Sequence, residues 1–119
     1  MAHLAVYNDI DVALDVFPWN GHTSACEALW MGVPVLAVLG GSMISRQSAS
    51  LLGAAGLEGW VADSPDGLAN LAASRAADLE ALAAQRAGMR ARLQASPLMD
   101  ARAFAARFEA LLREIAPVR

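Results

Sequence analysis

The chain has 119 residues, a net charge of −3 at pH 7 and a hydrophobic fraction of 56%, so it suits one domain or part of one. Its nine basic residues are all arginine and give no basic excess, which argues against a nucleic-acid binder. Charges interrupt each apolar run before the roughly 18 residues that a membrane helix needs, so we expect no membrane span.

The first elements expected are the end of a helix at Leu4 to Tyr7 and a buried strand from Val12 to Phe17. The start of the chain shows no basic leader, and we therefore expect a cytoplasmic protein. Asp9-Ile10-Asp11 superficially matches a metal-binding aspartate pair. Since it precedes the strand instead of following it, we interpret it as turn chemistry and expect no metal there.

A short helix follows within Trp19 to Pro34. Ser24 and Glu27 have the spacing of a capping box, and Gly32 followed by Pro34 provides a stop signal. The single cysteine, Cys26, cannot form an internal disulfide, and we expect it to be a small buried hydrophobic residue on the apolar face of this helix.

The junction between this strand and this helix is the main candidate site. A Gly21-His22-Thr23-Ser24 turn places backbone N–H groups, two hydroxyls and an imidazole at the positive end of a helix dipole. Such a turn suits a phosphate or a diphosphate. The alternative is purely structural, in which the hydroxyls cap the helix and His22 is a surface turn residue.

The pattern of strand, turn and helix then repeats. Val33 to Leu39 predicts a second, fully buried strand, Gly40-Gly41-Ser42 a turn, and the next segment a helix to about Ala55 with Gly56 as its stop. Trp60 to Ala62 is a plausible short third strand. This alternation predicts an α/β fold with a Rossmann-like parallel sheet, whose carboxyl edge holds both glycine turns.

Long helices complete the chain. Ser64-Pro65-Asp66 predicts the start of a helix, and we expect this helical region to break between Ser74 and Asp78. Ser96-Pro97 is expected to end the next helix, and Asp100 to cap the last one. The last helix has an apolar stripe that we interpret as core contacts, formed by Phe104, Phe108, Leu111, Leu112 and Ile115. We expect one partial domain, with nucleotide-binding β/α units over 1–63 and C-terminal helices over 64–119.

Several motifs occur in an order that resembles a known family. They are Asp11-Val12-Ala13-Leu14-Asp15, Asn20-Gly21-His22-Thr23, Glu27 to Pro34, Ser45-Arg46, Ser50-Leu51-Leu52, Ser96-Pro97-Leu98, Asp100 and Phe104. Together they resemble the C-terminal part of the catalytic region of the O-linked N-acetylglucosamine transferases and their SPINDLY-type relatives. The resemblance implies part of the donor-binding lobe of a GT-B glycosyltransferase, whose donor is a nucleotide sugar such as UDP-N-acetylglucosamine.

The resemblance also implies roles for individual residues. Gly21, His22, Thr23 and Ser24 match the turn that contacts the donor diphosphate, with His22 as the catalytic residue. Glu27 matches an acidic residue at the ribose, and His3 a histidine beside the uracil. Ser24 and Glu27 replace the Thr and Asp of the animal enzymes. Arg46 is a further candidate, either for the phosphates or for a carboxylate such as Glu27, and its alternative role is a surface ion pair. No metal or other cofactor is expected.

The sequence lacks other parts of that machinery. The family contacts the donor phosphate with a lysine, and this chain contains no lysine. We therefore expect a fragment, inactive alone, whose partners are the nucleotide sugar, a protein acceptor, a missing N-terminal lobe and helical repeats. Two alternatives stay open, namely a non-catalytic nucleotide- or phosphate-binding module and a helical protein-interaction fragment.

Overall fold

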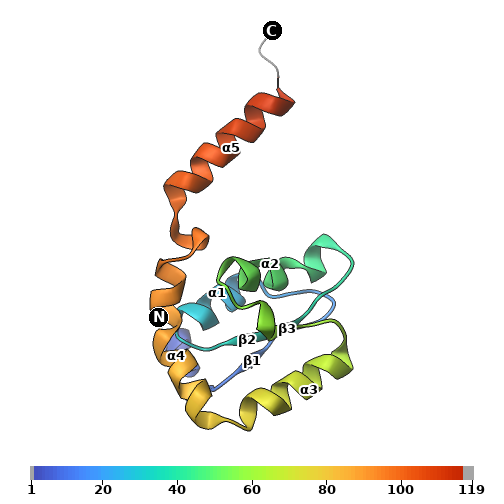
Figure 1. Ribbon diagram of the computed structural model, residues 1–119, viewed down its shortest axis with the longest axis vertical. Coiled ribbons are helices and arrows are strands. Elements are labelled where there is room, and N and C mark those ends of the chain that lie inside the picture. Colours follow the sequence, from blue (N-terminus) through green and yellow to red (C-terminus); the bar gives the residue numbers. More distant parts are fainter. Residues whose placement is uncertain (1, 117–119) are drawn as a thin grey trace.

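The computed structural model describes residues 2–116 and contains a small parallel sheet surrounded by helices (Figure 1). The strands are β1 (Ala13–Leu14), β2 (Val35–Val38) and β3 (Val61–Ala62). The α-helices are α1 (Thr23–Trp30), α2 (Gln47–Ala54), α3 (Pro65–Ala76), α4 (Leu79–Gln94) and α5 (Ala101–Ile115). Short 3-10 segments are η1 (Ala2–Asp9), η2 (Met43–Ser45), η3 (Glu58–Trp60) and η4 (Pro97–Met99).

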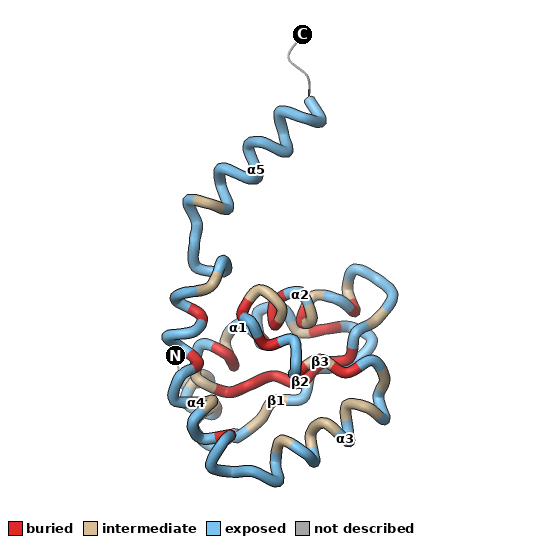
Figure 2. The backbone as a smooth tube through the Cα atoms, in the orientation of Figure 1, coloured by how far each residue is buried: buried red, intermediate tan, exposed pale blue. Residues whose placement is uncertain are grey.

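The sheet has the order β1-β2-β3, with β2 in the centre and both pairings parallel. Ala13 lies opposite Val35, and Ala37 lies opposite Val61. All four residues of β2 are buried, because α1 and α2 lie on one side of the sheet and α3 on the other (Figures 1 and 2). The predicted α/β class and the buried central strand are therefore confirmed.

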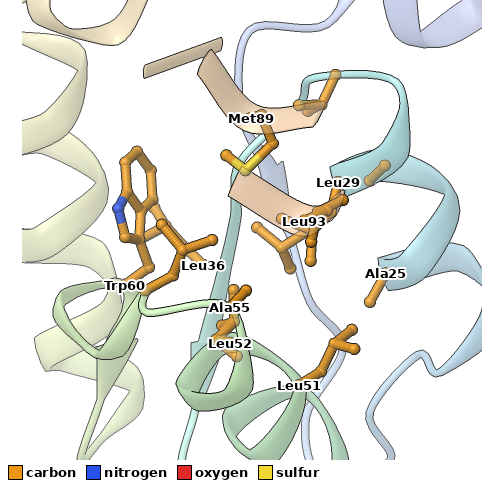
Figure 3. Close-up of a cluster of buried hydrophobic side chains, with 14 of the residues drawn as sticks. Ala25, Leu29, Leu36, Leu51, Leu52, Ala55, Trp60, Met89 and Leu93 are labelled. Atoms are coloured by element: carbon orange, nitrogen blue, oxygen red, sulfur yellow. The ribbon is translucent and has the colours of Figure 1, made fainter. Parts of the chain in front are cut away.

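The core lies between the sheet, α1, α2 and α4. Figure 3 shows Met89 and Leu93 of α4 reaching the same cluster as Leu29 of α1 and Leu36 of β2. Trp60 closes the cluster near β3, where the Arg75 guanidinium stacks on its ring at 4.7 Å. The helices α3 and α4 thus contribute to the same core as the β/α units.

Arginines of α4 tie this helix to the ends of the other elements. Arg90 donates two hydrogen bonds to the Trp30 carbonyl, at 3.0 and 2.7 Å, and lies over the Trp30 ring. Arg92 donates to the Gly56 carbonyl, and Arg86 to the Ile10 carbonyl. The bonds from Arg90 and Arg92 satisfy carbonyls at the ends of α1 and α2, where a cation also complements the helix dipole, whereas Arg86 binds the segment that precedes β1.

Most predicted helix boundaries are confirmed. Gly32 and Gly56 have φ angles of 84° and 68°, which suits their role as stops. Ser64, Asp78 and Asp100 cap α3, α4 and α5, each accepting a hydrogen bond from a first-turn amide.

Three local predictions were wrong. The strand expected over Val12 to Phe17 is limited to Ala13 and Leu14, and Leu14, Val16 and Phe17 are exposed, because β1 lies at the edge of the sheet. Leu4 to Tyr7 belongs to a 3-10 segment instead of the end of a longer α-helix. Cys26 is exposed, since the buried face of α1 is formed by Ala25, Ala28 and Leu29.

The apolar stripe of α5 does not enter the core. The helix extends away from the rest of the molecule, and its five stripe residues are between 44% and 68% exposed (Figure 2). Phe104 and Phe108 stack on each other, with ring centroids 6.1 Å apart. The prediction of core contacts was therefore wrong for residues 2–116, because this helix lies against η4 at its base and then leaves the body.

We expect this exposed stripe to cause self-association at high protein concentration, because burying apolar surface is favourable. Replacing Phe104 and Phe108 together by Asp should abolish the concentration dependence of the sedimentation coefficient. The matched control replaces Ala106 and Ala110 by Asp, which adds the same charge to the other side of α5 and should leave association nearly unchanged. A parent chain that sediments as a monomer at all concentrations would contradict this expectation.

Candidate functional site

The turn between β1 and α1 is held by buried polar contacts. Asn20 is only 2% exposed; its Nδ2 donates to the Val16 carbonyl at 3.2 Å, and its Oδ1 accepts from the Ser48 amide at 3.3 Å. Its backbone N–H donates to the Ile44 carbonyl at 3.0 Å. Asn20 thereby joins the loop after β1 to the loop after β2 and to α2.

Gly21 is fixed in the same network. Its N–H donates to Asp15 Oδ1 at 2.8 Å, and its carbonyl accepts from the Ser48 hydroxyl at 3.0 Å. A Cβ placed on Gly21 would lie 2.3 Å from the Ser24 hydroxyl oxygen, so a larger residue at this position would force the Ser24 side chain to move. The backbone of the turn predicted to bind the diphosphate is consequently held in place by hydrogen bonds on both sides of Gly21.

The helix α1 begins two residues earlier than its predicted capping box requires. His22 is the N-cap residue and makes no side-chain capping bond, and the first α-helical bond runs from the Cys26 amide to the His22 carbonyl at 3.1 Å. The Ser24–Glu27 capping box was therefore a wrong prediction. The amides of Thr23 and Ser24 precede the intrahelical pattern, and both residues are exposed.

The Glu27 carboxylate instead faces His3. Its Oε1 lies 3.5 Å from His3 Nε2, although the two residues are 24 positions apart in the sequence. The Tyr7 hydroxyl donates to the Ser24 carbonyl at 3.3 Å and thus fastens η1 to the first turn of α1. The structure therefore brings together the two residues expected at the ribose and at the base.

Two hollows flank His22. The first, which we name the Glu27 hollow, has a volume of about 480 Å³ and is lined by Leu4, His22, Cys26, Glu27, Trp30 and Met99 among others. The second, the Arg46 hollow, has about 500 Å³ and is lined by residues that include His22, Met43, Arg46, Gln47, Ser50 and Leu98. Both volumes lie in the range of small-molecule sites.

Arg46 is exposed and forms the N-cap of α2. Its Nη1 donates to the Gly40 carbonyl at 3.1 Å, which holds the guanidinium beside the carboxyl end of β2. The ion pairs found within residues 2–116 do not include Arg46, so an interaction with Glu27 is not seen there. Arg46 and His22 line the same hollow.

The Asp9 to Asp11 segment takes no part in this site. Asp11 lies 3.6 Å from the Arg86 guanidinium, on the side of the fold where α4 packs. Across the described part of the chain, no cluster of three or more His, Cys, Asp or Glu side chains could hold a metal ion. None of the helices described there is long and apolar enough to cross a membrane.

The sequence interpretation missed the supporting residues Asp15 and Ser48. Asp15 interrupts an apolar run immediately before the turn, and this unusual charge was a usable signal. Ser48 gave no such signal, because its contacts with Asn20 and Gly21 join residues 27 and 28 positions apart.

Comparison with known proteins agrees with this geometry. The model of the family described as glycosyl transferase family 41 matches residues 3–108. The chain belongs to that family. It is also similar to the probable UDP-N-acetylglucosamine–peptide N-acetylglucosaminyltransferase SPINDLY of Solanum lycopersicum, with 34% identity over 113 residues. A UDP-N-acetylglucosamine–peptide N-acetylglucosaminyltransferase of Giardia intestinalis is 40% identical over 50 residues.

A solved structure of a mutant O-GlcNAc transferase from Thermobaculum terrenum has the same arrangement, with a TM-score of 0.86 and 41% identity over 95% of this family 41 chain. The chain spans 22% of that structure and 12% of the SPINDLY relative from tomato. The family expected from the sequence motifs is thereby confirmed.

Cys26 lines the Glu27 hollow, so the reactivity of its thiol can be used as a chemical probe of this site. Although Cys26 is exposed as a residue, partial burial of its thiol raises the pKa of that group. A backbone hydrogen bond opposes this shift of the pKa, and the nearby Glu27 carboxylate adds to it. We expect alkylation by iodoacetamide to be slower than that of free cysteine at neutral pH and to accelerate at more alkaline pH, because the thiolate is the nucleophile. Mass spectrometry over a pH series measures this rate. A rate equal to that of free cysteine at pH 7 would contradict the expected shift.

Proposed function

We propose that this chain supplies the UDP-sugar-binding part of a protein O-glycosyltransferase, which transfers a sugar to Ser or Thr hydroxyls of proteins. The main support is the position of His22, which lines both hollows at the start of α1, next to the exposed residues Thr23 and Ser24 and on the same helix as Glu27 of the Glu27–His3 pair. The names of the relatives add a UDP-N-acetylglucosamine donor and a peptide acceptor to this proposal.

In this proposal the donor diphosphate lies at the start of α1. The positive end of the helix dipole and the amides of its first turn favour an anion there. The hydroxyls of Thr23 and Ser24 and the His22 imidazole add hydrogen bonds to the phosphate oxygens. Uridine lies toward Glu27 and His3, with the ribose at the Glu27 carboxylate and the base beside the His3 ring.

The proposal also gives His22 a role in catalysis, namely stabilisation of the departing diphosphate. Negative charge on the diphosphate grows as the bond between sugar and phosphate breaks, and donors already oriented toward those oxygens stabilise this transition state. His22 is the catalytic residue because its side chain can reach them from the N-cap position. The acceptor hydroxyl and the residue that takes its proton belong to parts of the enzyme that are not among these residues.

Titration calorimetry of the chain with UDP, GDP and inorganic phosphate in the presence of a chelator tests the proposal. We expect UDP to bind without a divalent metal and more tightly than GDP or phosphate, because Glu27 and His3 recognise the nucleoside. Glu27→Ala should reduce the UDP affinity while leaving phosphate binding within about twofold. The exposed Glu109 on α5 provides a matched control, Glu109→Ala.

Two results would overturn this assignment. Equal affinities for UDP, GDP and phosphate would indicate a generic anion site, which is the non-catalytic alternative. Binding that disappears with the chelator would contradict a donor site built from helix amides, hydroxyls and imidazole.

A further inference from the structure

One face of α1 borders the Glu27 hollow. His22, Cys26 and Trp30 line that hollow and follow one another at intervals of four residues, so they share this face of the helix. The helix rises by roughly 1.5 Å per residue, with His22 at its start and Trp30 as its last residue. Trp30 therefore lies almost one turn beyond Glu27, on the side away from the turn that contains His22.

Arg90 of α4 contacts Trp30 at two points. Its guanidinium donates two hydrogen bonds to the Trp30 carbonyl, at 3.0 and 2.7 Å, and its Cζ lies 4.8 Å from the centroid of the indole ring. The hydrogen bonds hold the backbone where α1 ends, and the stacking contact holds one face of the ring. A planar guanidinium can form paired hydrogen bonds and stack on an aromatic ring, which an ammonium group does less well. Arg90 thus restrains both the backbone and the side chain of Trp30.

Trp30 depends on such a contact because the core does not enclose it. Trp30 is 37% exposed, whereas the neighbouring Leu29 is 1% exposed. An exposed side chain keeps rotamer freedom unless a neighbour holds it, and ordering it when a ligand binds costs free energy. Among residues 2–116, Arg90 is not one of those that line the Glu27 hollow. It can therefore act on a ligand in that hollow through Trp30, without touching the ligand.

We infer that Arg90 is a positioning residue for the nucleoside of the donor and acts through Trp30. This inference rests on the proposed function, which places the nucleoside in the Glu27 hollow and the diphosphate at His22. Trp30 supplies an aromatic part of the wall of that hollow, and Arg90 holds it in place before the ligand binds. Because the wall is already ordered, the affinity for the nucleoside rises, while the affinity for phosphate at His22 is nearly unaffected.

Titration of UDP and of inorganic phosphate into the parent chain and its variants tests this role. Arg90→Ala should weaken UDP binding by about three- to tenfold and phosphate binding by less than about twofold. Arg90→Lys should give an intermediate UDP affinity, because lysine keeps the charge and loses the paired hydrogen bonds and the planar stacking. Circular dichroism verifies that each variant is folded.

Arg92→Ala is the matched control. Arg92 is an exposed residue of the same helix and also donates to a carbonyl just after a helix, that of Gly56, at 3.0 Å. In the part of the chain that the structure describes, Gly56 is not among the residues that line the Glu27 hollow. Arg92→Ala should therefore cost a similar amount of stability and leave the UDP affinity unchanged.

A double-mutant cycle tests whether Arg90 acts through Trp30. Trp30→Leu alone should weaken UDP binding, and Arg90→Ala added to it should weaken UDP binding by less than about 1.5-fold more. Nuclear magnetic resonance gives a readout that needs no Trp30 variant to fold. The indole N–H signal of Trp30 should shift with UDP and stay in place with phosphate. The signal of the buried Trp60, which stacks on Arg75, should stay in place with both.

Several results would overturn the role of Arg90 while leaving UDP binding by the parent chain, and thus the proposed function, intact. They are an unchanged UDP affinity in Arg90→Ala, an equal loss of UDP and phosphate affinity in that variant, and an equal loss of UDP affinity in Arg92→Ala. An undiminished effect of Arg90→Ala in the Trp30→Leu background would exclude an action through Trp30. Failure of the parent chain to bind UDP would instead overturn the proposed function, and with it this inference.

Discussion

Replacing His22 by Ala in a transferase that contains this segment is expected to lower kcat by two to three orders of magnitude and to change acceptor binding little. The reason is the position of the imidazole at the N-cap of α1, next to the free amides of Thr23 and Ser24. A donor aimed at the diphosphate oxygens acts mainly on the transition state, in which their charge has grown. Removal of one such oriented donor typically costs about 10²- to 10³-fold in rate.

The other histidine of the chain, His3, is expected to affect donor binding instead of the rate of the chemical step. His3 lies at the Glu27 carboxylate, where it would contact the base in both the ground state and the transition state. His3→Ala should therefore raise the donor KM and leave kcat within about threefold. Steady-state kinetics on both variants, normalised to folded protein, separates the two roles. If His22→Ala changes kcat by less than about threefold, worth roughly 0.65 kcal/mol, His22 is only a turn residue.

The sequence predicted those parts of the fold that depend on local signals. Ser64, Asp78 and Asp100 each cap a helix because a short oxygen-bearing side chain can reach an amide three residues later, whatever surrounds it. The uninterrupted apolar run of β2 likewise predicted a strand covered on both faces. Such features need no information about distant residues.

Predictions failed where two local signals compete or where distant residues decide. The Ser24–Glu27 pair has the spacing of a capping box, yet α1 begins at Thr23 and Glu27 turns toward His3, a partner that is 24 residues away. The stripe of α5 has the periodicity of a buried face, but that periodicity does not specify what covers it. In the candidate site, the motif residues were identified from sequence and Asp15 left a local signal, whereas the role of Ser48 depends on contacts that only the fold creates.

The second large effect is expected from Asn20→Ala, which should destabilise the folded chain by about 2 kcal/mol. Asn20 is buried, and both ends of its side-chain amide are used. The substitution leaves the amide of the buried Ser48 without its partner, and an unsatisfied buried polar group typically costs about 1–3 kcal/mol. The truncated side chain also leaves a small cavity, which adds to the loss.

The effect should extend to ligand binding, because Ser48 also holds the Gly21 carbonyl at 3.0 Å. Loosening the contact between α2 and the turn lets Gly21 and His22 move relative to the Arg46 hollow, so UDP affinity should fall even at temperatures where the variant remains folded. Urea unfolding and UDP titration of the same samples measure the two effects. Asn70→Ala, at an exposed position within α3, is the matched control and should be neutral or slightly stabilising, because Ala has the higher helix propensity. If Asn20→Ala and Asn70→Ala had the same free energy of unfolding, the Asn20 network would contribute nothing to holding the site.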